Sequence, residues 1–299
     1  MVNPARIQNL PTWRRKLFRA VERSGWPEPA WYETTKGGEG RPEAREAVAR
    51  GAEVLFVGGG DGTLRAAASI LAGTDVALAA IPAGTGNVLA LNLGLPTDVA
   101  DCVLVATRGG RIRIDLGEIE GRVFTIAAGI GLDAQMMVET SNRAKSRLGW
   151  PAYVAAALRH LSEPRFEAEI SLDGGPPLRR QVRSVLVANV GRLPGGISLI
   201  PSARPDDGEL NIVVIGPRWL HEWAGIWFSL IGRRPRGGRL ETFRARRALI
   251  RTEHPRAREL DGDPLSAGTS LDVRVRPAAL TVCIPEAGPP EVRRWGRPD

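Results

Sequence analysis

Two glycine-rich loops, each between a buried strand pattern and a helical pattern, constrain the fold of this 299-residue chain most strongly. The first, Gly58-Gly59-Gly60-Asp61-Gly62-Thr63, follows the apolar run 54–57 and precedes a helical pattern over 64–71. The second, Pro82-Ala83-Gly84-Thr85-Gly86-Asn87, follows the strand pattern 76–81 and precedes the helical pattern 88–93. Strands that alternate with helices predict a mostly parallel sheet, and its strand ends should bring both loops to one crevice.

The rest of the chain divides into two regions by its hydrophobic pattern. Before residue 116 we expect further helices over 13–21, 42–50 and 98–107 and a strand over 30–34. After Gly110, alternating apolar residues predict a β-rich half with strands near 123–127, 166–172, 182–190, 210–215, 271–275 and 280–284. Helical patterns interrupt it at 152–161 and 219–231. The sequence therefore predicts an α/β domain over 1–116, onto which 278–299 packs back, and a β-rich domain over 117–277.

Composition limits the classes of protein that remain. With 43% hydrophobic and 25% charged residues, the chain has the composition of a globular protein. Its net charge of +8 comes almost wholly from arginine, which suits nucleic acid, an anionic membrane or a phosphorylated ligand. Cys102 and Cys283 lack the spacing of a zinc site or a disulfide framework. We see no leader peptide and no spanning helix, and so expect a cytoplasmic protein whose membrane contact is peripheral.

The chemistry of the two loops indicates phosphate binding. Glycines let the backbone approach a phosphate, consecutive N–H groups form an anion cradle, and the following helix adds the positive end of its dipole. The first loop has neither the Gly-Lys-Ser/Thr of a Walker A loop nor a GxGxxG pattern, and it contains no lysine. Backbone donors, arginines and a divalent ion must therefore meet the phosphate charge, and Asp61 is placed to organise that ion. The alternative is a pair of tight turns that need glycine for steric reasons.

At these motifs the chain resembles the family of bacterial diacylglycerol kinases and sphingosine kinases. The resemblance rests on the Gly-Gly-Asp-Gly-Thr loop together with the second loop, and it covers about residues 30 to 285. Further matching motifs are Ile114-Asp115-Leu116-Gly117, Ala128-Gly129-Ile130-Gly131-Leu132-Asp133-Ala134, Pro194-Gly195-Gly196, Pro205-Asp206-Asp207-Gly208-Glu209-Leu210 and Leu260-Asp261-Gly262-Asp263-Pro264-Leu265.

The resemblance implies a first domain that binds ATP between the glycine loops and a β-sandwich second domain that closes over a lipid. It also implies a set of nucleotide-binding positions on the two loops and on the preceding strand end. These positions are Thr34, Thr35, Gly58, Gly59, Gly60, Asp61, Gly62, Thr63, Leu64, Arg65, Gly84, Thr85, Gly86 and Asn87.

Metal and catalytic roles follow from the same resemblance. Asp207 matches the side chain of a Mg²⁺ site that backbone oxygens of Arg204 and Glu209 complete, and we add Asp115 to this metal set. Asp263 matches the family's proton acceptor, which is more often a glutamate. Asp61 and Asp261 complete the candidate catalytic set. The alternatives are an Asp-Asp-Gly turn before the strand 210–215 and an exposed turn at 261–263.

Two departures from the family pattern bear on activity. Ala66 stands where the family commonly has a glutamate, so one acidic contact to metal or substrate is missing and the activity level is open. Asn3-Pro4 normally follows the family's first strand, so this strand is largely absent or the start site lies upstream.

These observations predict an ATP- and Mg²⁺-dependent lipid kinase of phospholipid metabolism, with diacylglycerol as the expected acceptor. The alternatives are a nucleotide-binding regulator that has lost catalysis, for which Ala66 speaks, and an NAD kinase, whose own second motif is absent. The expected partners are a lipid substrate and an anionic membrane surface, with a homodimer left open and no nucleic-acid motif. Trp219, Trp223 and Trp227, with arginines just beyond them, either contact that surface or pack on the second domain.

Overall fold

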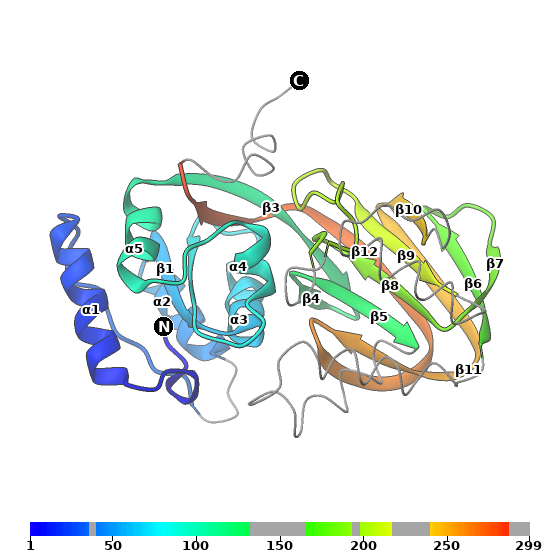
Figure 1. The fold of residues 1–299 in the computed structure, drawn as a ribbon, viewed down its shortest axis with the longest axis horizontal. Coiled ribbons are helices and arrows are strands. Elements are labelled where there is room, and N and C mark those ends of the chain that lie inside the picture. Colours follow the sequence, from blue (N-terminus) through cyan, green and yellow to red (C-terminus); the bar gives the residue numbers. More distant parts are fainter. Residues whose placement is uncertain (36–39, 132–164, 193–197, 217–239, 287–299) are drawn as a thin grey trace. The chain divides into compact units, whose positions relative to one another are not determined.

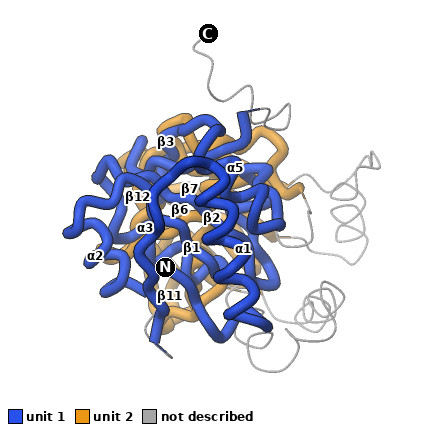
Figure 2. Tube along the Cα trace, turned by 90° about the vertical axis from the view of Figure 1, so that its left-hand side faces the viewer, with its two compact units in different colours: residues 1–116, 277–299 blue, residues 117–276 orange. Residues whose placement is uncertain are grey.

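The computed structural model describes residues 1–35, 40–131, 165–192, 198–216 and 240–286. The chain divides into two compact units (Figure 2). Unit 1 comprises Met1–Leu116 and Pro277–Asp299, and unit 2 comprises Gly117–Arg276. The helical patterns at 152–161 and 219–231, and with them the three tryptophans, lie outside the described residues. Within the described part of the chain, no helix is both long and apolar enough to span a membrane.

Unit 1 alternates helices and strands, as the sequence predicts (Figure 1). Its elements are η1 (Pro4–Arg6), α1 (Leu10–Arg23), α2 (Arg41–Ala49), β1 (Val54–Gly59), α3 (Asp61–Leu71), β2 (Ala77–Pro82), α4 (Val88–Asn92), α5 (Val99–Arg108) and the start of β3 (Gly110–Ile119). β1 and β2 pair in parallel, from Val54 opposite Ala77 to Gly59 opposite Pro82. The last part of β12 (Asp263–Ile284) adds a further parallel strand, with Val282 opposite Leu78.

The helices α1 and α5 of unit 1 each begin at a side-chain cap and bury one face. The side-chain oxygen of Asn9 accepts the N–H of Thr12 at the start of α1, and Asp98 caps α5 in the same way. Leu17 and Val21 of α1 pack with Val103 of α5 into the core. Helical spacing of the apolar residues produces this buried stripe on α1 and on α5.

The expected strand at 30–34 is wrong. Only Glu33 forms a bridge there, an isolated parallel pair with Val2, supported by a hydrogen bond from the Thr34 N–H to the Val2 oxygen. Pro27 and Pro29 stand just upstream and lack the N–H groups that a longer ladder requires. The backbone oxygen of Tyr32 accepts one further hydrogen bond, from the N–H of Val2.

Unit 2 is built from antiparallel strands. They are the end of β3, β4 (Arg122–Phe124), β5 (Ala127–Gly131), β6 (Phe166–Leu172), β7 (Leu178–Val182), β8 (Ser184–Ala188), β9 (Leu210–Ile215), β10 (Glu241–Ala245), β11 (Arg247–Leu260) and most of β12. The strand order β12-β11-β5-β8-β9-β10 forms its main path, and β6 pairs with β11 and β7. β11 pairs with β6 near Ile250 and with β5 near Leu260, with bulges in between. One strand thereby serves two groups of partners, which produces the predicted sandwich-like unit.

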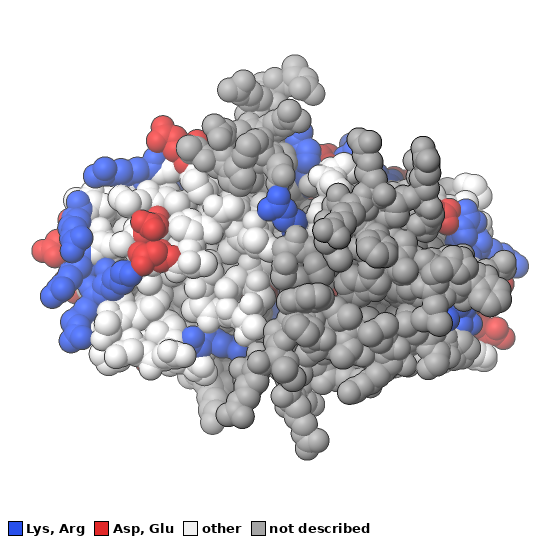
Figure 3. Space-filling model, viewed as in Figure 1, with Lys and Arg blue, Asp and Glu red and all other residues white. Residues whose placement is uncertain are grey.

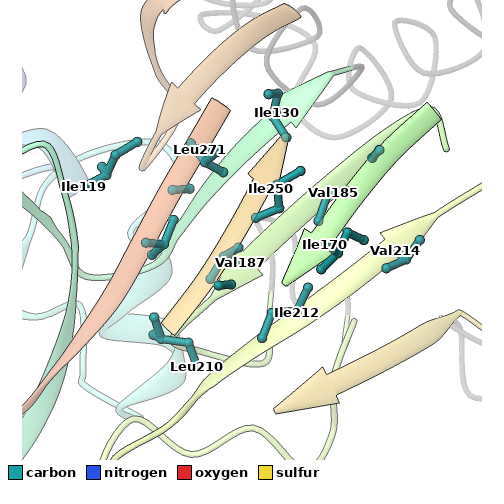
Figure 4. Close-up of a cluster of buried hydrophobic side chains, with 14 of the residues drawn as sticks. Ile119, Ile130, Ile170, Val185, Val187, Leu210, Ile212, Val214, Ile250 and Leu271 are labelled. Carbon is teal, nitrogen blue, oxygen red and sulfur yellow. The ribbon is translucent and has the colours of Figure 1, made fainter. Parts of the chain in front are cut away.

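The core of unit 2 is a layer of branched side chains that alternate along the strands. Ile130, Val187, Ile212 and Ile250 are all completely buried and come from four different strands (Figure 4). Period-2 alternation places them on one face, where β-branched side chains pack well. Burial of such a side chain stabilises the fold by about 1.5–3 kcal/mol. This core fixes the strand ends that carry the acidic turns described below.

Candidate nucleotide and phosphoryl-transfer site

The two glycine loops of unit 1 lie side by side. Parallel pairing of β1 with β2 sets Gly59 opposite Pro82, and the Ala83 N–H then donates to the Gly59 oxygen at 2.9 Å. A Cβ atom on Gly84 would lie 2.6 Å from the Cα of Gly60, far inside van der Waals contact. A Cβ atom on Gly60 would meet a milder restriction, since it would lie 3.3 Å from the Cα of Gly84. Glycine is therefore required at position 84 so that the two backbones can meet.

Asp61 joins the first loop to the helix that follows the second. Its Oδ1 accepts the N–H of Val88 at 2.8 Å and that of Leu89 at 3.4 Å, at the start of α4. The short α4 thus obtains a cap from 27 residues away, since Asn87 gives it no side-chain cap of its own. Burial raises the pKa of Asp61, and the backbone hydrogen bonds from α4 oppose this shift. The carboxylate that we expected to organise an ion is bound to a helix terminus.

Asn87 holds the second loop in a closed turn. Its Oδ1 accepts the Gly84 N–H at 2.9 Å, and its Nδ2 donates to the Gly84 oxygen at 2.7 Å. Asn87 itself adopts a left-handed backbone conformation with φ of 47°, which asparagine tolerates better than most residues. Thr85, at the tip of this turn, is exposed. Its hydroxyl is therefore available to a ligand.

The N-terminus of α3 is the second feature of the loop region that suits an anion. The N-cap residue of α3 is Gly60, which has no side chain. The N–H groups of the first turn therefore have no side-chain cap from this position. Helix N-termini of this kind bind phosphate through their N–H groups and dipole. Thr63 packs against Gly59 and accepts a hydrogen bond from Asn3 at 3.3 Å.

The remaining predicted nucleotide positions differ in their exposure. Leu64 and Arg65 are buried within α3, and Thr34 is buried near Gly40. Thr35 is exposed. Arg65 and Thr34 are therefore buried beneath the loop region and not exposed at its surface. Gly58 and Gly59 are also buried, at the end of β1, and only the loop from Gly60 onward reaches the surface.

The predicted metal ligands are divided between the two units. Asp115, in unit 1, is buried on β3 and accepts the N–H of Ala278 at 2.7 Å. Asp207 lies in unit 2. Its Oδ1 accepts a hydrogen bond from the Glu209 N–H at 3.1 Å, and its Oδ2 accepts one from the Arg244 guanidinium at 2.5 Å. Throughout the described ranges, no three His, Cys, Asp or Glu side chains gather as a metal site. The magnesium assignment stays a prediction.

The acidic turn before β12 contains carboxylates in two different environments. Asp261 accepts the N–H groups of Thr125, Ile126 and Ala127 and the Thr125 hydroxyl, all within 2.8–3.1 Å. Its φ of 48° is left-handed. Asp263, two residues later, is exposed at the start of β12. Of these two, Asp263 is the carboxylate that a substrate hydroxyl can reach, while Asp261 holds the 125–127 backbone.

Several residues that shape these sites escape prediction from the sequence. The buried Glu259 accepts the Gly262 N–H at 2.7 Å and so fixes the turn that carries Asp263. Arg244, 37 residues from Asp207, gives no sign of its partner in the sequence. The only signal for Glu259 in the sequence is an acidic residue directly before the motif that begins at Leu260.

Comparison with known proteins places the chain in a family. Residues 12–119 match the diacylglycerol kinase catalytic domain, and residues 125–284 match the YegS C-terminal NAD kinase beta sandwich-like domain. The "Probable lipid kinase YegS-like" of Pseudomonas aeruginosa is 32% identical over 94% of this chain and 92% of its own length. The "Diacylglycerol kinase" of Staphylococcus carnosus is 29% identical over 71% of this chain and 72% of its own.

Solved structures give the same result. A Bacillus anthracis protein proposed to be a diacylglycerol kinase aligns with a TM-score of 0.78 and 25% identity over 96% of both chains. An NAD kinase from Archaeoglobus fulgidus in complex with ATP aligns with a TM-score of 0.53 and 11% identity, over 98% of this chain and 94% of its own, which shows a shared fold alone. With both domain matches, the full-length relatives and the paired glycine loops in agreement, the chain belongs to the YegS-like and diacylglycerol kinase family of lipid kinases.

Proposed function

We propose that this lipid kinase transfers the γ-phosphate of ATP to a lipid hydroxyl, with diacylglycerol as the expected acceptor and phosphatidic acid as the product. The observation that carries the proposal is the side-by-side placement of the two glycine loops at the N-terminus of α3. Family membership supports the kinase chemistry. The choice of diacylglycerol rests on the name of the Staphylococcus carnosus relative and is our inference for this chain.

The residues of unit 1 would bind and orient the nucleotide. The first-turn N–H groups of α3 would donate to phosphate oxygens, and the bare backbones at Gly60 and Gly84 would let the phosphate chain approach closely. Asp61 would keep both loops in place through α4. Mg²⁺, bound with the nucleotide, would neutralise charge on the phosphate oxygens.

Asp263 would take the proton from the lipid hydroxyl. As the hydroxyl oxygen bonds to the γ-phosphorus, the bond from that phosphorus to the β-γ bridging oxygen breaks, and ADP leaves with the electron pair. The hydroxyl proton passes to a carboxylate oxygen of Asp263, which is exposed and held by the turn that Glu259 fixes. A positioned base of this kind contributes about 10²–10⁴-fold to the rate.

Two further candidates are separable from this function. Ala66 of α3 is fully buried and stands where the family commonly has a glutamate. The first candidate is therefore a protein that binds nucleotide but has lost catalysis with that glutamate. An NAD kinase shares only the fold. ADP release should be measured with ATP alone, with ATP and diacylglycerol micelles, and with ATP and NAD⁺. We expect ADP release to be fastest with ATP and diacylglycerol micelles. A regulator without catalysis would release ADP equally slowly in all three measurements. An NAD kinase would release ADP fastest with ATP and NAD⁺.

A peripheral contact with anionic lipid would bring the enzyme to its substrate. α1 exposes five cationic side chains, namely Arg14, Arg15, Lys16, Arg19 and Arg23. Figure 3 shows basic side chains gathered at the left edge of the molecule, where α1 lies in Figure 1. Arg14 lies over the Trp31 ring at 5.0 Å, and Lys16 pairs with Asp98. Each basic residue near an anionic bilayer contributes about 1 kcal/mol of attraction, which salt screens.

Vesicle sedimentation tests this contact. Replacing Arg19 and Arg23 with alanine should weaken binding to anionic vesicles by about 2 kcal/mol, roughly 30-fold, at low salt. The matched control replaces the exposed Arg45 of α2 and the exposed Arg50 directly after α2, which removes the same charge from another part of the surface. If both double variants lost vesicle affinity equally, the effect would come from net charge alone. This result would contradict a specific contact between α1 and the bilayer.

A further inference from the structure

The turn before β9 gathers three carboxylates in four residues. Asp206, Asp207 and Glu209 surround Gly208, whose φ of 74° makes the turn. The side chains of Asp206 and Asp207 are mostly buried, at 10% and 13% exposure. Like charges this close repel each other, and partial burial strengthens the repulsion. The acidic turn, residues 206–209, therefore requires a cation.

Arginine side chains meet this requirement in the structure. The guanidinium of Arg244 lies 2.5 Å from Asp207 Oδ2 and 2.9 Å from Glu209 Oε2. The Nε atom of Arg204 lies 3.2 Å from Asp206 Oδ1. Each of the three carboxylates thus has a guanidinium partner.

The position of Arg244 is fixed by the sheet and not by the turn alone. Arg244 stands on β10 directly opposite Asn211 of β9, and β9 begins at the residue that follows Glu209. Its side chain needs to extend over only two residues of the neighbouring strand to reach the acidic turn. The strand pairing thus brings this guanidinium to the turn whenever unit 2 is folded.

These contacts do not fit a magnesium site. Mg²⁺ takes oxygen ligands in a near-octahedral shell at about 2.0–2.1 Å. Both oxygens of Asp207 are already acceptors, Oδ1 for the Glu209 N–H and Oδ2 for Arg244. A guanidinium is a donor only and carries a positive charge, so it cannot share that shell with a divalent cation.

We propose that Arg244 is the resident cation of the acidic turn and that this turn binds no divalent ion in the protein. The proposal holds whether or not the catalytic proposal is correct, because it concerns the stability of unit 2. It changes the role of Asp207 from a metal ligand to one half of a bridge between β9 and β10. Mg²⁺ would then enter the kinase reaction only with the nucleotide.

Thermal unfolding without nucleotide tests the proposal directly. The Tm of the wild-type protein should be the same in millimolar MgCl₂ as in EDTA. Arg244→Gln should lower the Tm of unit 2 in EDTA by about 2–4 °C, the shift that corresponds to about 1 kcal/mol in a unit of that size. Mg²⁺ should then raise the Tm of Arg244→Gln, because the carboxylates of the acidic turn gain a cation in place of the lost guanidinium. The added change Asp207→Asn should abolish this gain.

Matched variants keep the test decisive. Arg180 pairs with Glu241 on the same strand as Arg244, so Arg180→Gln removes an equivalent ion pair away from the acidic turn. Its Tm should fall without any response to Mg²⁺, and Arg244→Lys should keep the wild-type indifference to Mg²⁺. A rise in wild-type Tm with Mg²⁺ that Asp207→Asn removes would overturn the proposal. So would an Arg244→Gln protein as stable in EDTA as the wild type.

Discussion

The side-chain carboxylate of Asp61 accepts the backbone N–H of Val88 across 2.8 Å, so the first glycine loop holds the helix that follows the second. The Cβ that Gly86 lacks would lie 2.9 Å from the other oxygen of the same carboxylate. This relationship makes the two loops one structural unit. Loss of either loop's geometry should therefore affect nucleotide binding at both.

Asp61→Ala should destabilise unit 1 and weaken ATP binding, since it removes the acceptor of the Val88 and Leu89 N–H groups. The expected loss of unfolding free energy is about 1–3 kcal/mol. Asp61→Asn keeps an acceptor oxygen and should lose much less. Urea unfolding and calorimetric titration with ATP measure the two effects. If Asp61→Ala unfolded and bound ATP like the wild type, the link between the loops would have no energetic role.

The raised pKa of Asp61 predicts a pH dependence with a definite sign. Because burial raises the pKa in the folded protein, this group favours folding most below its unfolded pKa of about 4, and that contribution is lost as pH rises through the folded pKa. The stability of the wild type relative to Asp61→Asn should therefore fall between about pH 3 and pH 7. Paired urea titrations at the two pH values measure it, and a relative stability that rises with pH would contradict the burial of this carboxylate.

Gly84→Ala should disrupt the contact between the loops, because its Cβ would lie 2.6 Å from the Gly60 Cα. Overpacking of this kind costs about 1–3 kcal/mol, and we expect ATP affinity to fall with it. Gly110→Ala is the control, since a Cβ there meets only side-chain atoms of Ile284, at 3.6 Å or more. Equal Tm and ATP dissociation constants for the two variants would show that the loops can move apart freely.

Asp261→Asn and Asp263→Asn should separate structure from chemistry. Asp261 accepts three backbone N–H groups and a hydroxyl, so its change should lower the unfolding free energy by about 2 kcal/mol or more. Asp263→Asn should change stability much less than Asp261→Asn, because the Asp263 side chain is exposed. Asp173→Asn serves as a control, since Asp173 also accepts two backbone N–H groups at positive φ but in an exposed turn. A stable Asp261→Asn protein would mean that the 125–127 backbone does not need this carboxylate.

Much of unit 1 could be predicted from its sequence, because glycine loops and apolar runs mark its strand ends. β1 and β2 lie where the patterns place them. In unit 2, residues 166–172 and 210–215 are predicted to be strands and coincide with β6 and β9. β11 is different: it contains four arginines and a proline, so its strand character comes from pairing with β12 and β6 and not from its own composition.

The candidate site was predictable as a set of loops but not as a set of contacts. Asp61 binds α4 across 27 residues and Arg244 binds Asp207 across 37, and neither pairing leaves a periodic signal. The same limit applies to Asp261, whose role in holding Thr125 spans 136 residues. Each of these links joins residues far apart in the sequence, so no local pattern reveals it.

The most direct test of the account is transfer of labelled γ-phosphate from ATP to a panel of lipid hydroxyls in mixed micelles, with diacylglycerol, sphingosine and a glycolipid as acceptors. We expect labelled lipid from at least one acceptor, diacylglycerol first, with Asp263→Asn slower by about 10²–10⁴-fold and its ATP dissociation constant within a few-fold of the wild type. Asp263→Glu should retain substantial activity. A protein that binds ATP but labels none of these lipids, or an Asp263→Asn protein that labels them at the wild-type rate, would contradict the account.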